Sequence, residues 1–222
     1  RTHEASTGDL LTLSPLQYGL RTYLAVSGGI DAESFLESQS TYLPAGLGGF
    51  KGRALRKGDT LEGRPTHRQK TSEYLETPKH LRLSIGHSFA LRTSPGPDVR
   101  SEDLENIWSS TYKATQRANR IGLELEGKFP NLSNSDVLPS AAIFPGAVQL
   151  PPRGRGFLLL PDCQTTGGYP HILQVNRADR HLLGQIRPND TIRFLQRTPQ
   201  QASRDLREKQ ALLSEWLPDF HL

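Results

Sequence analysis

The chain has 222 residues, of which 35% are hydrophobic, and carries a formal net charge of +4 at pH 7. This length allows one large domain or two small ones with a sizeable core. A single cysteine, Cys163, excludes an internal disulfide framework. The sequence shows neither a signal peptide nor an apolar stretch of membrane-spanning length, so we expect a cytoplasmic protein without a membrane partner. Glycine (20) and proline (16) are abundant and no long stretch repeats the helical period, which predicts a mainly β fold.

The first region, residues 1–78, has short apolar runs between glycine turns, which predict strands at residues 10–13, 20–26 and 60–61. A polar stretch, residues 63–78, follows and is expected to act as a linker. Positive charge is concentrated between Lys51 and Lys70, but no aromatic residues interleave it to stack on bases. We therefore expect no nucleic-acid partner and interpret this segment as a solvated loop or a partner-binding surface. Binding of an anion such as phosphate or bicarbonate remains open.

The second region, residues 79–198, begins with apolar alternation that predicts strands at residues 81–85 and 89–93, followed by a turn at residues 94–97. A helix is predicted next, capped by Ser101, with three apolar side chains on one face as core residues: Leu104, Ile107 and Trp108.

Residues 121–127 alternate again, which places Glu124 and Glu126 on the same face of a strand. Paired carboxylates can perform acid and base catalysis, but on an alternating strand a solvated polar face is the favoured interpretation. Glu126 is kept as a weak candidate for that chemistry.

The apolar run Phe157–Leu160 predicts a buried strand that ends in a polar, glycine-rich loop, Gln164–Pro170. In that loop Gln164, Thr165 and Thr166 supply amide and hydroxyl groups, and the two glycines allow a ligand to approach the backbone. The alternative is a tight hairpin, in which Gly167 and Gly168 supply positive φ angles before a strand at residues 172–175.

A closing strand is predicted at residues 192–195, and residues 199–222 form a helical tail. Thr198 to Gln201 has the pattern of a capping box with Pro199 at the first helical position. Four apolar residues make the tail amphipathic: Leu206, Leu213, Trp216 and Leu217.

The sequence lacks the motifs of a nucleotide phosphate loop and of a metal site. The glycines of residues 46–52 do not have the spacing of a nucleotide phosphate loop, and the seven histidines do not have the spacing of metal ligands, so no metal is expected. Cys163 follows an apolar strand without an evident base, which indicates a small buried hydrophobe rather than a nucleophile.

Two long motifs, QTTGGYP at Gln164–Pro170 and FPGAVQLPP at Phe144–Pro152, closely resemble the biotin-dependent carboxyltransferase family of KipA and the C subunit of 5-oxoprolinase. This family includes the carboxyltransferase domain of urea carboxylase, called allophanate hydrolase subunit 2 in older naming. Three upstream motifs resemble the family in the same order: Tyr23–Asp31, Ser40–Tyr42 and Gly48–Leu55. The sequence departs from the family around Asn119, where the family has a serine at position 118 and a methionine at position 121.

The resemblance implies a cyclophilin-like β-barrel with few short helices for residues 79–198. It also implies that residues 1–78 are the back half of a smaller β subdomain, because the family carries a further segment ahead of the point where this sequence begins. The resemblance further implies that the chain works as one subunit of a pair with a KipI-like partner protein.

Three functions follow from the resemblance. The first is a subunit of an ATP-dependent 5-oxoprolinase, which opens 5-oxo-L-proline to L-glutamate and can include a LamB/YcsF-like subunit. The second is the carboxyltransferase part of a urea carboxylase-type enzyme that uses biotin. The third is a KipA-like antagonist of a kinase inhibitor, which is not an enzyme. In the enzymatic cases the resemblance implies a small amide or lactam as the substrate. Because this chain has no nucleotide motif, ATP would act at the level of the complex.

No complete catalytic group can be named from the sequence, but polar residues of the matching motifs suit the binding of an amide and a carboxyl group. Arg120 would act as an anion clamp. The full set of expected substrate-binding residues is Asn119, Arg120, Gln149, Gln164, Thr165, Thr166, Gly167, Gly168 and Tyr169.

Overall fold

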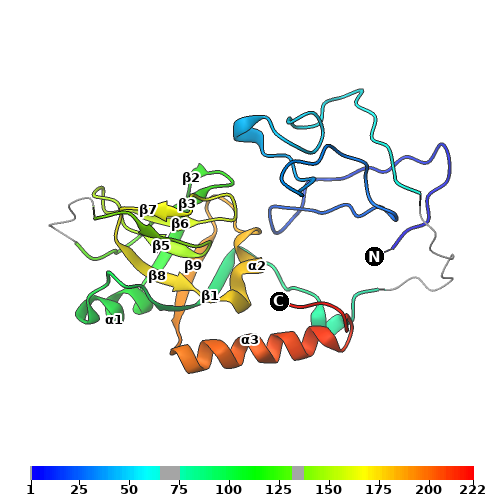
Figure 1. The fold of residues 1–222 in the computed structure, drawn as a ribbon. Helices are drawn as coiled ribbons and strands as arrows, with labels where there is room; N and C mark the ends of the chain where they lie inside the picture. The colour runs from blue at the N-terminus through cyan, green and yellow to red at the C-terminus, as the bar shows by residue number, and fades with distance from the viewer. Residues whose placement is uncertain (1, 66–75, 132–137) are drawn as a thin grey trace. The chain divides into compact units, whose positions relative to one another are not determined.

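The computed structural model describes residues 2–65, 76–131 and 138–222 (Figure 1). The chain divides into two compact units. The first consists of Arg1–Ala5 and Thr22–Glu76, and the second of Ser6–Arg21 and Thr77–Leu222. The chain is mainly β, with a closed seven-strand barrel and three α-helices among the described residues. The predicted linker, residues 63–78, lies largely outside the described residues.

The first unit has irregular backbone in its described part, with one 3-10 helix, η1 (Leu43–Ala45), and isolated bridges such as Glu33 to Gly49. No strand forms at residues 20–26 or 60–61, and none at residues 10–13, which belong to the second unit, so these three predictions are wrong. Their apolar side chains find no neighbouring strand to bury them in the described chain, and Leu10 and Leu24 are 90% and 57% exposed. An apolar run without a hydrogen-bonded neighbour does not form a sheet.

The second unit is built around the barrel, whose strands β1 and β9 are parallel while all other neighbours are antiparallel. In their order around the barrel the strands are β1 (Ser88–Pro95), β8 (His171–Val175), β5 (Ala147–Gln149), β6 (Gly156–Leu159), β3 (Gly122–Glu126), β2 (Thr111–Ala118) and β9 (Thr191–Gln196). The strands predicted at residues 89–93, 121–127, 157–160, 172–175 and 192–195 are confirmed within one or two residues. The strand predicted at residues 81–85 is wrong, because that segment holds the 3-10 helix η2 (Lys79–Leu81) and irregular backbone.

Alternation along the strands decides which side chains fill the barrel. Leu123 and Leu125 of β3 and Leu158 of β6 are fully buried in the main apolar core. The residues between them point to the outer face, since successive side chains of a strand point to opposite sides. Glu124 lies opposite Phe157, and Phe157 lies opposite Gln149, so these three form one row across the outside of β3, β6 and β5.

Helix α1 (Ser101–Ser109) packs on the barrel through Ile107, which is buried, and through Leu104 and Trp108, which pack against the core. The predicted apolar face is therefore confirmed. The predicted cap is wrong: Arg100 is the N-cap residue and makes no side-chain cap, while Ser101 is the first helical residue. The negative charge of Asp103, in the first turn, interacts favourably with the positive end of the helix dipole. Asp103 also forms an ion pair with Arg100 at 2.7 Å.

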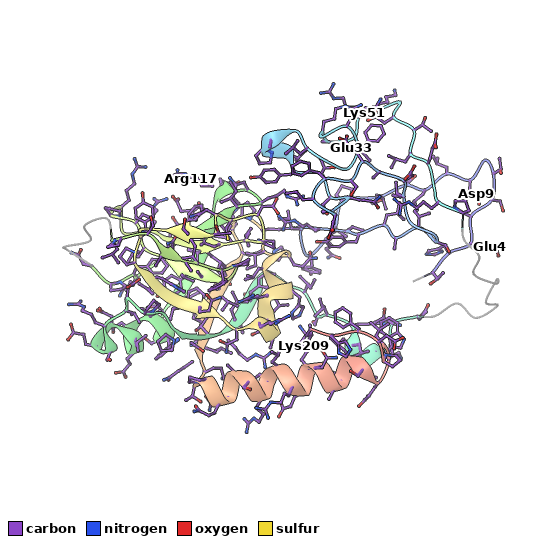
Figure 2. All side chains as sticks on the ribbon, viewed as in Figure 1. Glu4, Asp9, Glu33, Lys51, Arg117 and Lys209 are labelled. Carbon is purple, nitrogen blue, oxygen red and sulfur yellow. The ribbon has the colours of Figure 1, made fainter. Side chains whose placement is uncertain are left out.

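Helix α3 (Pro199–Ser214) begins with the predicted capping box, in which Thr198 and Gln201 bond reciprocally. The helix lies along β1 and the 3-10 helix η3 (Arg177–Asp179), which leads into the short helix α2 (Arg180–Leu183) (Figure 1). Asp205 of α3 is buried and accepts from Arg197 at 2.9 Å. Lys209, labelled in Figure 2, donates to the Ala178 carbonyl at 2.7 Å. Partly buried polar contacts thus fix the helix to the barrel.

No helix in the described part of the chain is long and apolar enough to span a membrane.

Candidate active site on the outer face of the barrel

A two-stranded arm covers part of the outer barrel face. It consists of β4 (Ala141–Ala142) and β7 (Thr166–Gly167), which pair antiparallel. Beneath it lies a second apolar cluster, formed by Ile143, Ala147 and Leu159 with Phe157 and Cys163 packed against it. The predicted glycine-rich loop therefore runs over an apolar floor that sits outside the barrel.

Gln149 joins this floor to the loop. Its side chain is only 2% exposed, and its Nε2 donates to the backbone carbonyl of Tyr169 at 3.2 Å. A Cβ added to Gly167 would lie 2.8 Å from that nitrogen, so the glycine permits the close approach. Neither Gly167 nor Gly168 has a positive φ, and the alternative of a hairpin that needs left-handed glycines is wrong.

The polar side chains of the loop face outward. Gln164, Thr165 and Thr166 are exposed, and their side chains make no hydrogen bond within the described residues. Tyr169 is 43% exposed. These amide and hydroxyl groups are therefore available to a ligand, whereas the amide nitrogen of Gln149 is already used to hold the loop.

Asn119 and Arg120 lie beside the start of the loop, because the Asp162 amide donates to the Arg120 carbonyl at 3.2 Å. The Asn119 side-chain oxygen accepts from the amides of Ile121 and Gly122 at 2.8 and 3.0 Å, which closes its own turn. The Arg120 guanidinium forms a two-point ion pair with Asp162, with Nε 2.5 Å from Oδ2. The structure therefore places both residues beside the predicted site. Their side-chain hydrogen bonds, however, go to other parts of the protein and stabilise the local backbone.

A pocket of about 190 Å³ opens beside the arm. Its lining residues are Pro97, Asp98, Leu138, Pro139, Ala141, Ala142, Ile143, Gly167, Tyr169 and His171. Burial lowers the pKa of the His171 imidazole, so this ring is neutral at pH 7. Its buried Nε2 has no hydrogen-bond partner in the described structure. Sequence reasoning missed His171 and Asp98, because no local pattern marks them.

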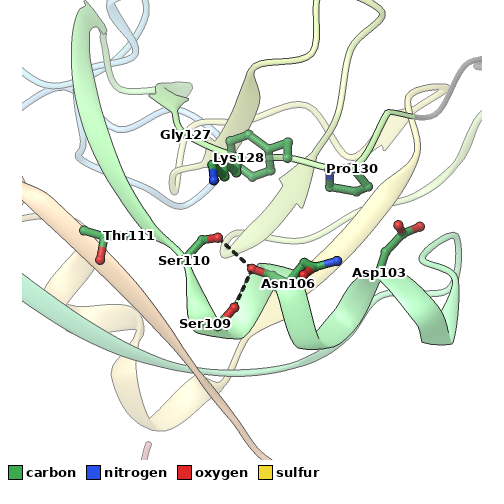
Figure 3. A pocket seen from close by; sticks show the side chains of 9 residues that line it. Asp103, Asn106, Ser109, Ser110, Thr111, Gly127, Lys128 and Pro130 are labelled. Atoms are coloured by element: carbon green, nitrogen blue, oxygen red, sulfur yellow. Dashed lines mark hydrogen bonds between the residues drawn. The ribbon is translucent and has the colours of Figure 1, made fainter.

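A larger pocket, of about 820 Å³, lies at the end of α1 and contains none of the predicted residues (Figure 3). The hydroxyls of Ser109 and Ser110 both donate to the Asn106 carbonyl, at 3.2 and 2.7 Å (Figure 3). They satisfy a carbonyl that the helix end leaves free, which is a structural task. We therefore place the candidate site at the smaller pocket, where the loop lies.

Cys163 packs on the apolar cluster beneath the arm, but it is partly buried rather than buried as predicted. Burial raises the pKa of its thiol, so the thiol stays protonated at neutral pH and is a poor nucleophile. Among the described residues no three His, Cys, Asp or Glu side chains form a group that could hold a metal ion.

The prediction of a solvated face is wrong for Glu124, because its side chain is buried. It accepts hydrogen bonds from Arg117, Arg155 and Thr115. Burial alone would raise the pKa of this carboxyl, but the hydrogen bonds from Arg155 and Thr115 and the charges of both arginines outweigh it and lower the pKa. Alternation identifies the face of the strand correctly but cannot reveal that arginines from two other segments cover it.

A family model described as "Carboxyltransferase domain, subdomain A and B" matches residues 1–196. The chain belongs to this carboxyltransferase domain family. The resemblance drawn from the motifs is thereby confirmed, and it extends over both units.

Among curated proteins, the carboxyltransferase domain is 35% identical to the C subunit of the Escherichia coli K12 5-oxoprolinase over 91% of this chain and 64% of that protein. It is 32% identical to the C subunit of the Haemophilus influenzae 5-oxoprolinase over 96% of this chain and 68% of that protein. Urea amidolyase of Lachancea kluyveri is 28% identical over 99% of this chain but 13% of its own length. The chain is thus homologous to the C subunit of 5-oxoprolinase, related to urea amidolyase, and spans about two thirds of the two 5-oxoprolinase proteins.

Solved structures agree with the fold. The crystal structure of TTHA0988 has a TM-score of 0.69 and 33% identity, and the match covers 82% of this chain and 35% of that one. The Kluyveromyces lactis urea amidolyase has a TM-score of 0.79 over 93% of this chain and 14% of its own. At 24% identity this second likeness concerns the carboxyltransferase fold alone.

Proposed function

We propose that this carboxyltransferase domain forms part of the C subunit of a 5-oxoprolinase, an enzyme complex that opens 5-oxo-L-proline to L-glutamate at the expense of ATP. The observation that carries the proposal is the 35% identity to the Escherichia coli 5-oxoprolinase protein, which runs through both units. The urea amidolyase relatives share less identity and extend over a small part of their own length.

The geometry of the loop suits a small lactam. The pocket of about 190 Å³ is small and suits one small ring compound. Gln164, Thr165 and Thr166 are exposed on the adjoining loop and do not line this pocket, so they would contact a ligand at its edge. There the amide of Gln164 and the two hydroxyls can donate to a lactam carbonyl and accept from its N–H. Such groups stabilise charge that develops on the carbonyl oxygen during ring opening. Tyr169 belongs to the loop and also lines the pocket.

The remaining expected site residues have supporting tasks in this proposal. Asn119 and Arg120 fix the turn next to Asp162, and Gln149 holds the loop from below. Gly167 and Gly168, which have no side chains, would let the loop backbone lie close to Gln149 and the apolar cluster. The ligand-facing set is therefore Gln164, Thr165, Thr166 and Tyr169.

Partner proteins complete the enzyme in this proposal. The site has polar binding groups but no nucleophile paired with a base within the described residues, so catalysis requires a KipI-like subunit and, for 5-oxoprolinase, a LamB/YcsF-like subunit. ATP would bind elsewhere in the complex. We further propose a cyclophilin-like identity for the barrel, a β-subdomain origin for the first unit and a cytoplasmic location for the protein.

A biotin-dependent carboxyltransferase of the urea carboxylase type is the second candidate, because the Lachancea kluyveri urea amidolyase aligns with 99% of this chain. The same polar loop would then face urea and the carboxyl group carried by biotin.

The test is a direct comparison of the two reactions. We expect the complex of this chain with its partner proteins to convert 5-oxoproline to glutamate with ATP, and the chain alone to be inactive. Carboxylation of urea from carboxybiotin, with no 5-oxoproline turnover by the full complex, would replace the first proposal by the second. Full activity of the isolated chain would refute the requirement for partners.

A further inference from the structure

Two half-exposed arginines meet at one buried carboxylate on the outer face of the barrel. Arg117, near the end of β2 (Figure 2), donates from Nη1 to Oε2 of Glu124 at 3.0 Å. Arg155, just before β6, donates from Nη1 to Oε1 at 2.9 Å. The Glu124 side chain is 8% exposed, whereas those of Arg117 and Arg155 are 66% and 52% exposed. The carboxylate is therefore covered while the guanidinium groups face solvent.

The contact geometry differs from that of three two-point ion pairs in the described chain, although Asp205 is likewise shared, through its Oδ2, by Arg92 and Arg197. Three aspartates each take two nitrogens of one guanidinium: Asp59 with Arg53, Asp179 with Arg92 and Asp162 with Arg120. Glu124 instead shares its two oxygens between two arginines, and each arginine gives it a single hydrogen bond. A guanidinium carries five N–H donors, so each of these arginines keeps most of its donors for another acceptor.

This arrangement exceeds what neutralising Glu124 requires. A single arginine in two-point contact would balance one carboxylate, as it does for the partly buried Asp162. The second arginine leaves the cluster with a net positive charge. Because both guanidinium groups touch the same carboxylate, they are neighbours whose remaining donors can converge on one group, and Glu124 fixes their positions.

We propose that Arg117 and Arg155, positioned by Glu124, bind an anionic group with two or more acceptor oxygens, a carboxylate or a phosphoryl group. Planar guanidinium groups match such oxygens in two-point contacts, which a point charge cannot do. Glu124 acts through the arginines and is a positioning residue.

The location connects this site with the candidate loop. Glu124, Phe157 and Gln149 are successive neighbours across three adjacent strands, so Glu124 and Gln149 are about 10 Å apart on the same face. The Phe157 ring lies over Gly122, where an added Cβ would come within 2.1 Å of it. Phe157 therefore lies between the arginine cluster and Gln149, the residue that holds the loop. That the anion is the carboxylate of the substrate rests on the proposed function.

Binding by the intact chain tests the site, with inorganic phosphate and 5-oxoproline as separate probes at constant ionic strength, followed by NMR titration. The matched control is Arg153→Gln, because Arg153 is exposed, lies two positions from Arg155 and makes no ion pair within the described chain. We expect Arg117→Gln and Arg155→Gln each to weaken binding at least about tenfold and Arg153→Gln to leave it unchanged. Arg155→Lys keeps the charge beside Glu124 and the fold, and should also weaken binding.

Binding of 5-oxoproline with the same arginine dependence identifies a carboxylate ligand, and binding of phosphate alone identifies a phosphoryl ligand; either result supports the site. Absence of binding by both probes, or an equal loss in Arg153→Gln, overturns it and leaves the arginines as neutralisers of Glu124. Turnover is not read in this experiment, so a failure of the proposed function would not alter its result.

Discussion

At the scale of single residues, Glu124 links stability to pH. Its pKa is lowered in the folded chain. A carboxyl with a depressed folded pKa stabilises the fold above its unfolded pKa of about 4.3, and this stabilisation is lost as the pH falls through the folded value. We therefore expect the free energy of unfolding of the wild type to fall more steeply than that of Glu124→Gln as the pH drops below about 5.

The same substitution should lower the free energy of unfolding at pH 7 by about 1–3 kcal/mol, because the amide removes the negative charge and one of the two acceptor oxygens that the arginines use. Urea unfolding followed by circular dichroism measures both effects. Glu126→Gln is the control, since Glu126 lies on the same strand and is exposed, and its effect should stay within about 0.5 kcal/mol. Equal pH dependence of wild type and Glu124→Gln would contradict the role given to this carboxylate.

Gly167 offers a second test at this scale. An added Cβ would lie 2.8 Å from the Gln149 Nε2 and 3.0 Å from the Ile143 Cδ1. Both neighbours are buried, so Gly167→Ala should cost about 1–3 kcal/mol through displaced packing. Gly86→Ala is the matched control, because a Cβ there meets nothing within 4 Å and the φ angle is ordinary, so it should be neutral or slightly stabilising. Equal melting temperatures for both variants would show that Gly167 is not closely packed against Gln149 and Ile143.

At the scale of elements, α3 is held both at its start and along its length. Thr198 accepts from the Gln201 amide at 3.2 Å, and the Gln201 side chain accepts from the Thr198 amide at 2.9 Å. Thr198→Ala should therefore lower the free energy of unfolding by about 1 kcal/mol. Gln200→Ala, in the same exposed turn but outside the box, should change it by less than about 0.5 kcal/mol. If both variants unfold like the wild type, the contacts of Asp205 and Lys209 suffice to hold the helix.

The elements also show where sequence reasoning succeeds. The strands of the barrel and the apolar face of α1 are predictable because alternation and helical spacing report burial directly. Short apolar runs such as residues 10–13 mislead, because a strand needs a hydrogen-bonded neighbour that the run itself does not reveal. The structure of the loop is also hidden: Gly167 suggests a turn, but its contact is with Gln149, far away in the sequence.

The candidate site is predictable only where its residues share a motif. Gln164 to Tyr169 are consecutive, so their chemistry can be read from the sequence. The cluster around Glu124 draws its arginines from β2 and from the segment before β6, and the closed order of the strands brings them together. Such long-range contacts leave no local pattern.

At the scale of the whole molecule, the chain consists of two units that together match a carboxyltransferase domain, and it spans about two thirds of its 5-oxoprolinase relatives. The described part offers a polar loop over an apolar floor and no catalytic pair. This surface is consistent with the proposal that partner proteins complete the enzyme.

The central claim is that the loop binds substrate and is not merely a turn. The most direct measurement is ATP-dependent 5-oxoproline turnover by the reconstituted complex, with the melting temperature of each variant measured in parallel. Gln164→Ala and Thr165→Ala should each reduce kcat/KM by about tenfold or more, equivalent to at least about 1.4 kcal/mol, and leave the melting temperature unchanged. Gln149→Ala, the structural counterpart, should lower both, because its buried amide holds the loop. If every loss of turnover is instead matched by a loss of folded protein, the loop is structural and the substrate binds elsewhere.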